Sequence, residues 1–146
     1  MSEKNFEFIP GAVYFAGVGP GDAGLLTCRA LKLIETAEVI LYAGSLINPE
    51  ILSFASVDAA FFNTSQMVLV EQIKVMIEAA KNRKIIARLH SGDPSIYGAI
   101  NEQIMELRKA GVPYQIIPGV SSAFAAAAAL EIEYTLPEST QTVIFT

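Results

Sequence analysis

Short apolar runs alternate with segments of helical period along this chain, and Gly- and Pro-rich stretches follow the apolar runs. Each apolar run is typical of a buried strand, and each periodic segment is typical of an amphipathic helix. Strands that alternate with helices predict βαβ units, so the expected fold is α/β, with a mostly parallel sheet that has helices on both faces. The expected strands are residues 12–18, 39–42, 60–62, 84–89, 114–117 and the start of a further one at 142–145; the expected helices are residues 25–37, 48–54, 70–81, 97–109 and 121–130.

Apolar residues mark the inward faces of two of these helices. They are Leu26, Ala30, Leu33, Ile34 and Ala37 in residues 25–37, and Val70, Ile73, Ile77 and Ala80 in residues 70–81. The small side chains of residues 123–129 predict that the last helix packs closely against the sheet.

The carboxyl ends of parallel strands meet at one edge of a sheet, and ligands of open α/β folds bind at that edge. The stretches at 17–24, 43–49, 91–98 and 118–122 all follow expected strands. We therefore expect these four loops to lie together and to include the functional site.

Composition limits the class of protein. The chain has 146 residues, 52% of them hydrophobic, and a net charge of −5 without a basic patch, which disfavours nucleic acid as a partner. Gly, Pro or charged residues interrupt every apolar stretch before the ~18 residues that a membrane span needs, and the N-terminal residues do not resemble a signal peptide. The single cysteine, Cys28, fits a reducing compartment, so a cytoplasmic protein is expected. The apolar excess indicates an oligomer interface or a second domain.

The first loop, Gly17-Val18-Gly19-Pro20-Gly21-Asp22, does not fit the common nucleotide-binding patterns. Asp22 stands where a dinucleotide-binding loop has its third glycine, no acid ends the strand at 39–42, and no Gly-Lys-Ser/Thr follows. Two interpretations stay open: a tight turn in which Asp22 caps the next helix, and a loop that binds another ligand.

Two further loops have the composition of backbone cradles. Gly92 allows positive φ or the close approach of a ligand, while Asp93 could cap the following helix or bind a ligand group. Ser121 and Ser122 offer hydroxyls and N–H groups at the start of a helix. His90 has no Cys or His companion, so we interpret it as a structural hydrogen-bonding residue.

The sequence lacks the residue sets that several kinds of catalysis need. No Ser-His-Asp set can be assembled, no metal-ligand spacing occurs, and there is no Cys-x-x-Cys, so neither a metal site nor a catalytic residue is predicted. An enzyme built from this chain is expected to act by holding two reactants together.

Taken in order, the loop motifs resemble the tetrapyrrole (corrin/porphyrin) methylase family. They are GVGPGDAGLLT, LYAGSLINPE, RLHSGDPSIYGAI, PGVSSAFAAAAAL and TLPESTQT, and they extend over nearly the whole chain. LYAGSLINPE and RLHSGDPSIYGAI resemble the branch that methylates precorrin-4 or cobalt-precorrin-4 at C11. The resemblance implies transfer of a methyl group from S-adenosylmethionine to a ring carbon, the N-terminal domain of a two-domain fold, and a homodimer.

The resemblance also implies binding roles for individual residues. Contacts to S-adenosylmethionine are expected from Pro20, Ser91, Gly92, Asp93, Ile96, Ser121 and Ser122. Contacts to the tetrapyrrole are expected from Gly19, Gly21, Asp22 and Arg88, with Arg29 as a second cation for its carboxylates. Ala43 stands where a related uroporphyrinogen methylase has an acid, so no base can be assigned there.

The resemblance leaves the substrate and the extent of the site open. Residues 1–137 are expected to form the N-terminal α/β domain, and residues 138–146 a linker and the start of a second domain. The alternatives are a methylase of another precorrin, of uroporphyrinogen III or of diphthine, and a non-catalytic α/β binding domain.

Overall fold

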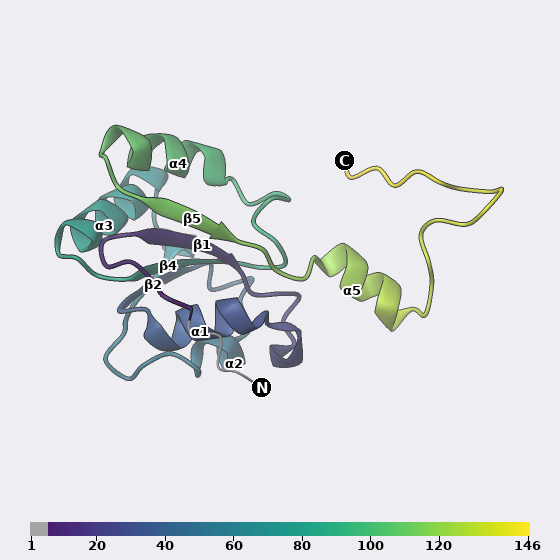
Figure 1. Cartoon of the computed structure of the whole chain (residues 1–146), viewed down its shortest axis with the longest axis horizontal. Coiled ribbons are helices and arrows are strands. Elements are labelled where there is room, and N and C mark those ends of the chain that lie inside the picture. Colours follow the sequence, from purple (N-terminus) through teal and green to yellow (C-terminus); the bar gives the residue numbers. More distant parts are fainter. Residues whose placement is uncertain (1–5) are drawn as a thin grey trace.

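The computed structural model describes residues 6–146 and contains a sheet of five parallel strands (Figure 1). The strands lie in the order β3-β2-β4-β1-β5, and every neighbouring pair is parallel, which confirms the predicted sheet. Their bounds are β1 Val13–Gly17, β2 Val39–Tyr42, β3 Ala60–Asn63, β4 Ile86–His90 and β5 Tyr114–Ile117.

Helices cover both faces of the sheet, as predicted (Figure 1). The helices α1 and α2 lie on one face, and α3 and α4 lie on the other. The bounds are α1 Cys28–Thr36, α2 Pro49–Leu52, α3 Leu69–Lys81, α4 Ile100–Lys109 and α5 Ser122–Ala129, with short 3-10 turns η1 at Ala23–Leu25 and η2 at Thr64–Gln66.

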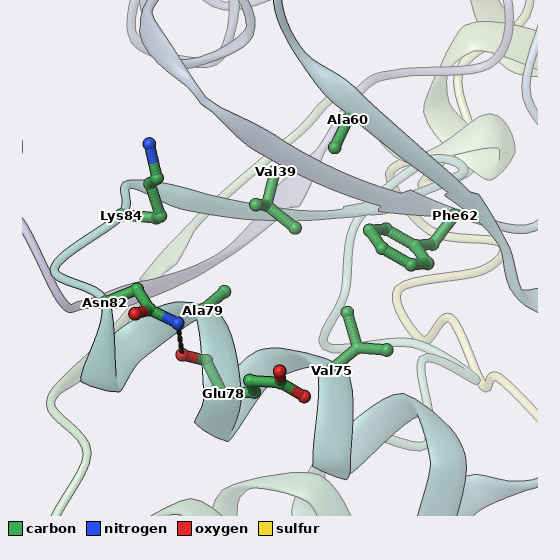
Figure 2. Close-up of a pocket in the computed structure, with 8 residues that line it drawn as sticks. All are labelled: Val39, Ala60, Phe62, Val75, Glu78, Ala79, Asn82 and Lys84. Carbon is green, nitrogen blue, oxygen red and sulfur yellow. Dashed lines mark hydrogen bonds between the residues drawn. The ribbon is translucent and has the colours of Figure 1, made fainter.

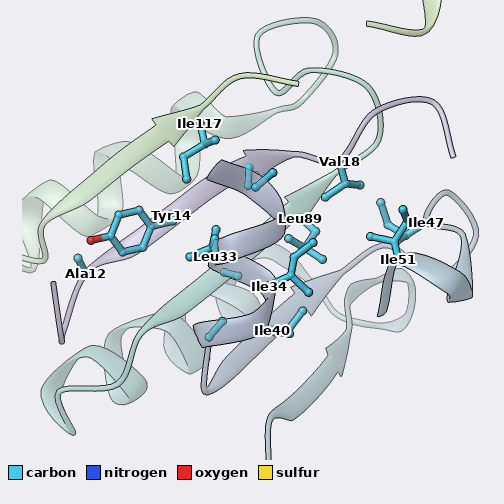
Figure 3. Packing of buried hydrophobic residues seen from close by; sticks show 14 residues of the cluster. Ala12, Tyr14, Val18, Leu33, Ile34, Ile40, Ile47, Ile51, Leu89 and Ile117 are labelled. Carbon is cyan, nitrogen blue, oxygen red and sulfur yellow. The ribbon is translucent and has the colours of Figure 1, made fainter. Parts of the chain in front are cut away.

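The first hydrophobic core lies between α1, α2 and the sheet (Figure 3). Leu33 and Ile34 of α1 are fully buried against Ile40 and Leu89 of the strands, and Ile51 of α2 extends the cluster. Burying a side chain of this size contributes about 1.5–3 kcal/mol. The predicted inward face of α1 is confirmed.

The second core lies between the other face of the sheet and the helices α3 and α4. Phe15, Leu41 and Ile86 alternate along their strands with the residues of the first core, as the period of two requires. On α3 the prediction was partly wrong, since Val70 is exposed and Met76 is fully buried.

Four predictions about helices and strands were wrong. The helix expected at 25–37 begins only at Cys28, because Thr27 is its N-cap. The helix expected at 97–109 begins only at Ile100, because Tyr97 and Ala99 have left-handed φ angles of 54° and 48°. Residues 142–145 form no strand, because they have no strand to pair with. The helix α5 does not pack on the sheet; it projects beyond the carboxyl ends of the strands, and Phe124 is 57% exposed (Figure 1).

Within residues 6–146, no helix has the length and apolar character that a membrane crossing requires. The N-terminal segment expected to lack a signal peptide includes residues 1–5, which lie outside the described residues.

Candidate functional site

The loops after β1 and β4 are joined at the carboxyl edge of the sheet. Gly17 and His90 are register partners at the ends of these strands, so both loops leave the sheet at the same level. Beyond them the Gly19 N–H donates to the Gly92 carbonyl at 3.2 Å, and the Gly92 N–H donates to the Gly19 carbonyl at 2.7 Å. The first and second glycine loops therefore form one continuous surface, as the prediction of a common edge requires.

The loop after β5 packs onto the same point through a contact of three glycines, Gly17, Gly92 and Gly119, which we call the glycine junction. A Cβ atom on Gly17 would lie 2.5 Å from the Gly92 carbonyl oxygen and 2.6 Å from the Gly119 nitrogen. A Cβ atom on Gly119 would overlap the Gly92 oxygen and lie 2.6 Å from the Gly17 carbonyl carbon. At Gly17 and Gly119 only backbone atoms fit, so glycine is required at these two positions by close approach.

The carboxylate of Asp93 links the second loop to the third. One oxygen accepts the Ser95 N–H at 2.8 Å, and the other accepts the Gly119 N–H at 2.8 Å. Burial alone raises the pKa of Asp93, but hydrogen bonds with Ser95 and with the Gly119 N–H outweigh that cost and hold the pKa below its usual value. Asp93 does not cap α4, because that helix starts seven residues later, at Ile100.

Gly92 lies against the start of α5. Its φ of 63° is left-handed, and a Cβ atom there would lie 3.4 Å from the Ser122 nitrogen. The Ser121 hydroxyl accepts the Ala123 N–H at 3.3 Å and so caps the helix as predicted. The first N–H groups of a helix have no partner inside it, so this position offers donors next to Gly92.

The loop after β2 joins the site through Asn48. Its amide group donates to the Gly21 carbonyl at 2.8 Å, while its oxygen accepts the Glu50 N–H and caps α2. Asp22 caps the short turn η1 through the Gly24 N–H, whereas Thr27 caps α1. Of the two interpretations left open, the one in which Asp22 caps the helix α1 itself does not hold.

Arg88 and His90 lie beneath the loops, on the face of the sheet that α3 and α4 cover. Arg88 is 7% exposed, and burial lowers its pKa to about 10. His90 is 8% exposed; burial, followed by the nearby Arg88 cation, lowers its pKa to about 3. The His90 Nε2 atom has no hydrogen-bond partner among the described residues, so our interpretation of His90 as a hydrogen-bonding residue was wrong for this atom.

The remaining predicted residues differ in their positions. Pro20 and Ile96 are half-buried in the first and second loops, and Ser91 is exposed. Arg29 donates to the Gln115 side chain at 2.7 Å, away from the loops. A contact between Arg88 and a substrate would require its guanidinium to leave the interior.

Sequence reasoning missed the close approach of Gly17 and Gly119 and the contact of Asn48 with Gly21. Gly17 ends β1, Gly119 and Asn48 follow strands, and both glycines stand in the loop motifs described above. A glycine at the end of one strand and another just after a second strand were the available signal, but the signal required knowing that β1 lies between β4 and β5.

A separate groove of about 490 Å³ lies between α3 and the face of β2 and β3 that this helix covers (Figure 2). It is lined by Val39, Ala60, Phe62, Val75, Glu78, Ala79, Asn82 and Lys84. Lys84 is paired with Glu38 at 2.7 Å. The groove contains no glycine loop and is open, so we place the candidate site at the glycine junction.

Several known proteins have sequences similar to this one. Residues 12–146 match the family described as Tetrapyrrole (Corrin/Porphyrin) Methylases. The cobalt-precorrin-4 C(11)-methyltransferase of Methanocaldococcus jannaschii is 54% identical over 134 residues, which are 92% of this chain and 52% of that protein. The precorrin-4 C(11)-methyltransferase of Pseudomonas aeruginosa is 47% identical over 92% of this chain and 53% of its own length. This chain thus spans about half the length of the relatives that it matches.

Solved structures share the fold. The crystal structure of a cobalt precorrin-4 methyltransferase, a cobalamin biosynthetic enzyme, superposes with a TM-score of 0.89 at 44% identity, covering 92% of this chain and 56% of that one. A uroporphyrin-III C-methyltransferase from Thermus thermophilus, complexed with S-adenosyl homocysteine, gives a TM-score of 0.72 at 30% identity, covering 87% and 51%. With the sequence match over residues 12–146, these likenesses show that the chain belongs to the tetrapyrrole methylase family.

Proposed function

We propose that this chain forms the donor-binding half of an S-adenosylmethionine-dependent methyltransferase that acts at C11 of precorrin-4 or cobalt-precorrin-4 in cobalamin biosynthesis. The observation that carries the proposal is the glycine junction, where three loops meet at the carboxyl edge of the sheet and are linked by Asp93. The names of the relatives at 42–54% identity supply the substrate class.

The donor contacts that we propose are Pro20, Ser91, Gly92, Asp93, Ile96, Ser121 and Ser122. These residues fit such a ligand in one respect that the structure allows us to test. Gly92 has a left-handed φ of 63°, and a Cβ atom there would be in ordinary contact with the Ser122 nitrogen at 3.4 Å, so its backbone lies next to the start of α5. A flat, polar donor molecule is suited to such a surface of backbone atoms.

The residues of this chain contribute binding and orientation to the proposed reaction. When bound, S-adenosylmethionine supplies a methyl group that is already activated on a sulfonium sulfur. The three loops would hold the donor at the glycine junction, and orientation of two reactants can lower a barrier by about 7–11 kcal/mol. Asp93 is ionised at neutral pH and fixes the shape of the cradle through its two backbone hydrogen bonds.

For the tetrapyrrole, we propose contacts from Gly19, Gly21 and Asp22 of the first loop. Gly21 has open space around its Cα atom, so its backbone is accessible. None of the four loops contains Lys or Arg, so they supply N–H groups but no cation for the carboxylates of the substrate.

Other substrates within the family have weaker support. The uroporphyrin-III C-methyltransferase structures are 30–33% identical to this chain, and the siroheme synthase of Hahella chejuensis is 40% identical. The precorrin-4 methyltransferases reach higher identity, so we favour precorrin-4 or its cobalt form.

Calorimetric titration with S-adenosylhomocysteine tests the proposal directly. We would titrate this chain, and a chimera that adds the C-terminal half of the Methanocaldococcus jannaschii relative, with NAD as the control ligand. The expected result is saturable binding of S-adenosylhomocysteine and no binding of NAD. If neither protein binds it although both are folded, the loops are only turns and the chain is a non-catalytic α/β domain.

Asp93→Ala is expected to weaken both the cradle and donor binding. The change removes the acceptor for the Ser95 and Gly119 N–H groups, and hydrogen bonds to a charged group contribute about 1.5–3 kcal/mol. Urea unfolding should show a loss of that size, and the affinity for S-adenosylhomocysteine should fall about tenfold or more. Asp58→Ala, at an exposed position far from the loops, is the control. Equal effects of the two changes would contradict the assigned role of Asp93.

We also propose that the protein acts in the cytoplasm as a homodimer, and that residues 1–137 form a domain followed by a linker from residue 138. The single cysteine, which fits a reducing compartment, supports the location. Exposed apolar side chains support a covered surface, among them Phe124, Leu130, Ile132 and Ile144 in or after α5. Sedimentation analysis of the chimera would test the dimer.

A further inference from the structure

Within the part of the chain that the structure describes, Arg88 is a buried cation without a carboxylate partner. Its Nε donates to the Gln103 side-chain oxygen at 3.4 Å, its Nη2 to the Gln72 side-chain oxygen at 3.4 Å, and its Nη1 to the Leu89 carbonyl at 3.3 Å. The ion pairs found within residues 6–146 are Lys32–Glu35, Lys84–Glu38 and Lys109–Glu106, and none includes Arg88. A buried charge is costly unless its hydrogen bonds are satisfied, and the two glutamines and the Leu89 carbonyl each accept one hydrogen bond from Arg88.

Gln103 connects Arg88 to the backbone at the start of α4. It is 3% exposed, and its side-chain nitrogen donates to the Ala99 carbonyl at 3.2 Å. A glutamine amide has one accepting end and one donating end. Because the guanidinium of Arg88 can only donate, it turns the oxygen of Gln103 toward itself and the NH₂ group toward Ala99.

The backbone that Gln103 holds is strained. Tyr97 and Ala99 both have left-handed φ angles, and a side chain on Gly98 between them would overlap the Pro94 carbonyl oxygen. Non-glycine residues keep such angles only where the surrounding structure enforces them, and they are concentrated at functional sites. Tyr97–Ala99 follows directly on the Gly92–Ile96 segment.

We infer that Arg88 and Gln103 are positioning residues, which hold the Tyr97–Ala99 turn and thereby fix the shape of the Gly92–Ile96 segment. The identity of the bound ligand as S-adenosylmethionine rests on the proposed function above. The effect on the backbone does not depend on that proposal, so the two can be tested separately.

Gln72 provides a matched comparison. It accepts from Arg88 at the same distance as Gln103, but its own NH₂ group donates to the Met67 carbonyl, at the start of α3 and away from the turn. If Arg88 served only to join β4 to the two helices, loss of either glutamine would have the same consequence. If Gln103 positions the turn, only its loss affects the Gly92–Ile96 segment.

The test measures amide hydrogen exchange of Ser95 and Ile96, whose N–H groups bond to Asp93, in Gln103→Met and Gln72→Met. In Gln103→Met we expect exchange about fivefold to tenfold faster at these two amides, the factor set by loss of one or two hydrogen bonds. Gln72→Met should leave the exchange of these two amides unchanged. The amides of β1 serve as the control, and neither variant should change their exchange. Affinity for S-adenosylhomocysteine should fall by a similar factor in Gln103→Met only.

A second variant covers the event that Gln103→Met does not fold. Gln103→Glu gives Arg88 a carboxylate partner and preserves side-chain size, but it removes the donor to Ala99, so the same local increase in exchange is expected. Equal exchange rates in the Gln72 and Gln103 variants would overturn the inference. Faster exchange in Gln103 variants of a protein that never binds S-adenosylhomocysteine would refute the proposed function and support the positioning role.

Discussion

Gly119→Ala is expected to lower the free energy of unfolding by about 3 kcal/mol or more, because one methyl group has no space at the glycine junction. It would overlap the Gly92 carbonyl oxygen and lie 2.6 Å from the Gly17 carbonyl carbon, and both are backbone atoms that cannot turn aside. Removing this steric overlap requires the second and third loops to move apart, which would break the hydrogen bond from the Gly119 N–H to Asp93. Urea unfolding of the two proteins measures the loss.

Gly111→Ala is the control for this change. Gly111 has a φ of 68° and no atom within contact distance of a Cβ atom, so alanine there meets only backbone strain. That strain costs about 1–2 kcal/mol. Gly119 is not among the glycines with positive φ, so its cost is steric alone. If Gly119→Ala is no more destabilising than Gly111→Ala, the three loops do not pack as described.

The alternation of apolar runs and periodic segments was sufficient to predict the sheet and the two helical layers. The strands at 39–42 and 114–117 were predicted with the bounds that the structure shows. The continuous apolar character of Val39–Tyr42 is what burial on both faces requires, whereas Tyr114–Ile117 is an edge strand with Gln115 and Ile116 exposed. The start of α4 was missed because the residue types of Tyr97 and Ala99 do not indicate left-handed angles, and the contact of Arg88 with Gln103 above this turn joins residues 15 apart in sequence.

The candidate site was predicted at the level of loops but not at the level of contacts. Gly92 and Asp93 were singled out from their residue types, and their loop does meet the first and third loops at the carboxyl edge. The glycine junction could not be predicted, because strand order determines which loops are neighbours. The strand expected at 142–145 shows the same limit, since an apolar pattern forms a strand only beside a partner.

His90 is expected to make the stability of the protein strongly dependent on pH below about 6.5. In the folded state burial lowers its pKa to about 3, from 6.5 as the ordinary value. Two charged groups lie near His90. Arg88 lowers the pKa of His90 further, and Asp93 raises this pKa by less than burial lowers it. Above pH 6.5 the ring is neutral in both states, and its burial costs nothing through protonation.

Between pH 6.5 and 3 the unfolded chain binds a proton that the folded chain does not, so folding stability falls with decreasing pH by about 1.4 kcal/mol per pH unit. From pH 6.5 to 4 the loss is about 3 kcal/mol, a large part of the 5–15 kcal/mol typical of a domain. Because His90 is the only histidine, His90→Leu removes this contribution entirely. Urea unfolding of both proteins between pH 8 and 4 should give diverging curves below pH 6.5, with the variant less sensitive. Parallel curves would mean that the folded protein protonates His90 as readily as the unfolded chain does, and the buried, unpaired position of its Nε2 atom would then be wrong.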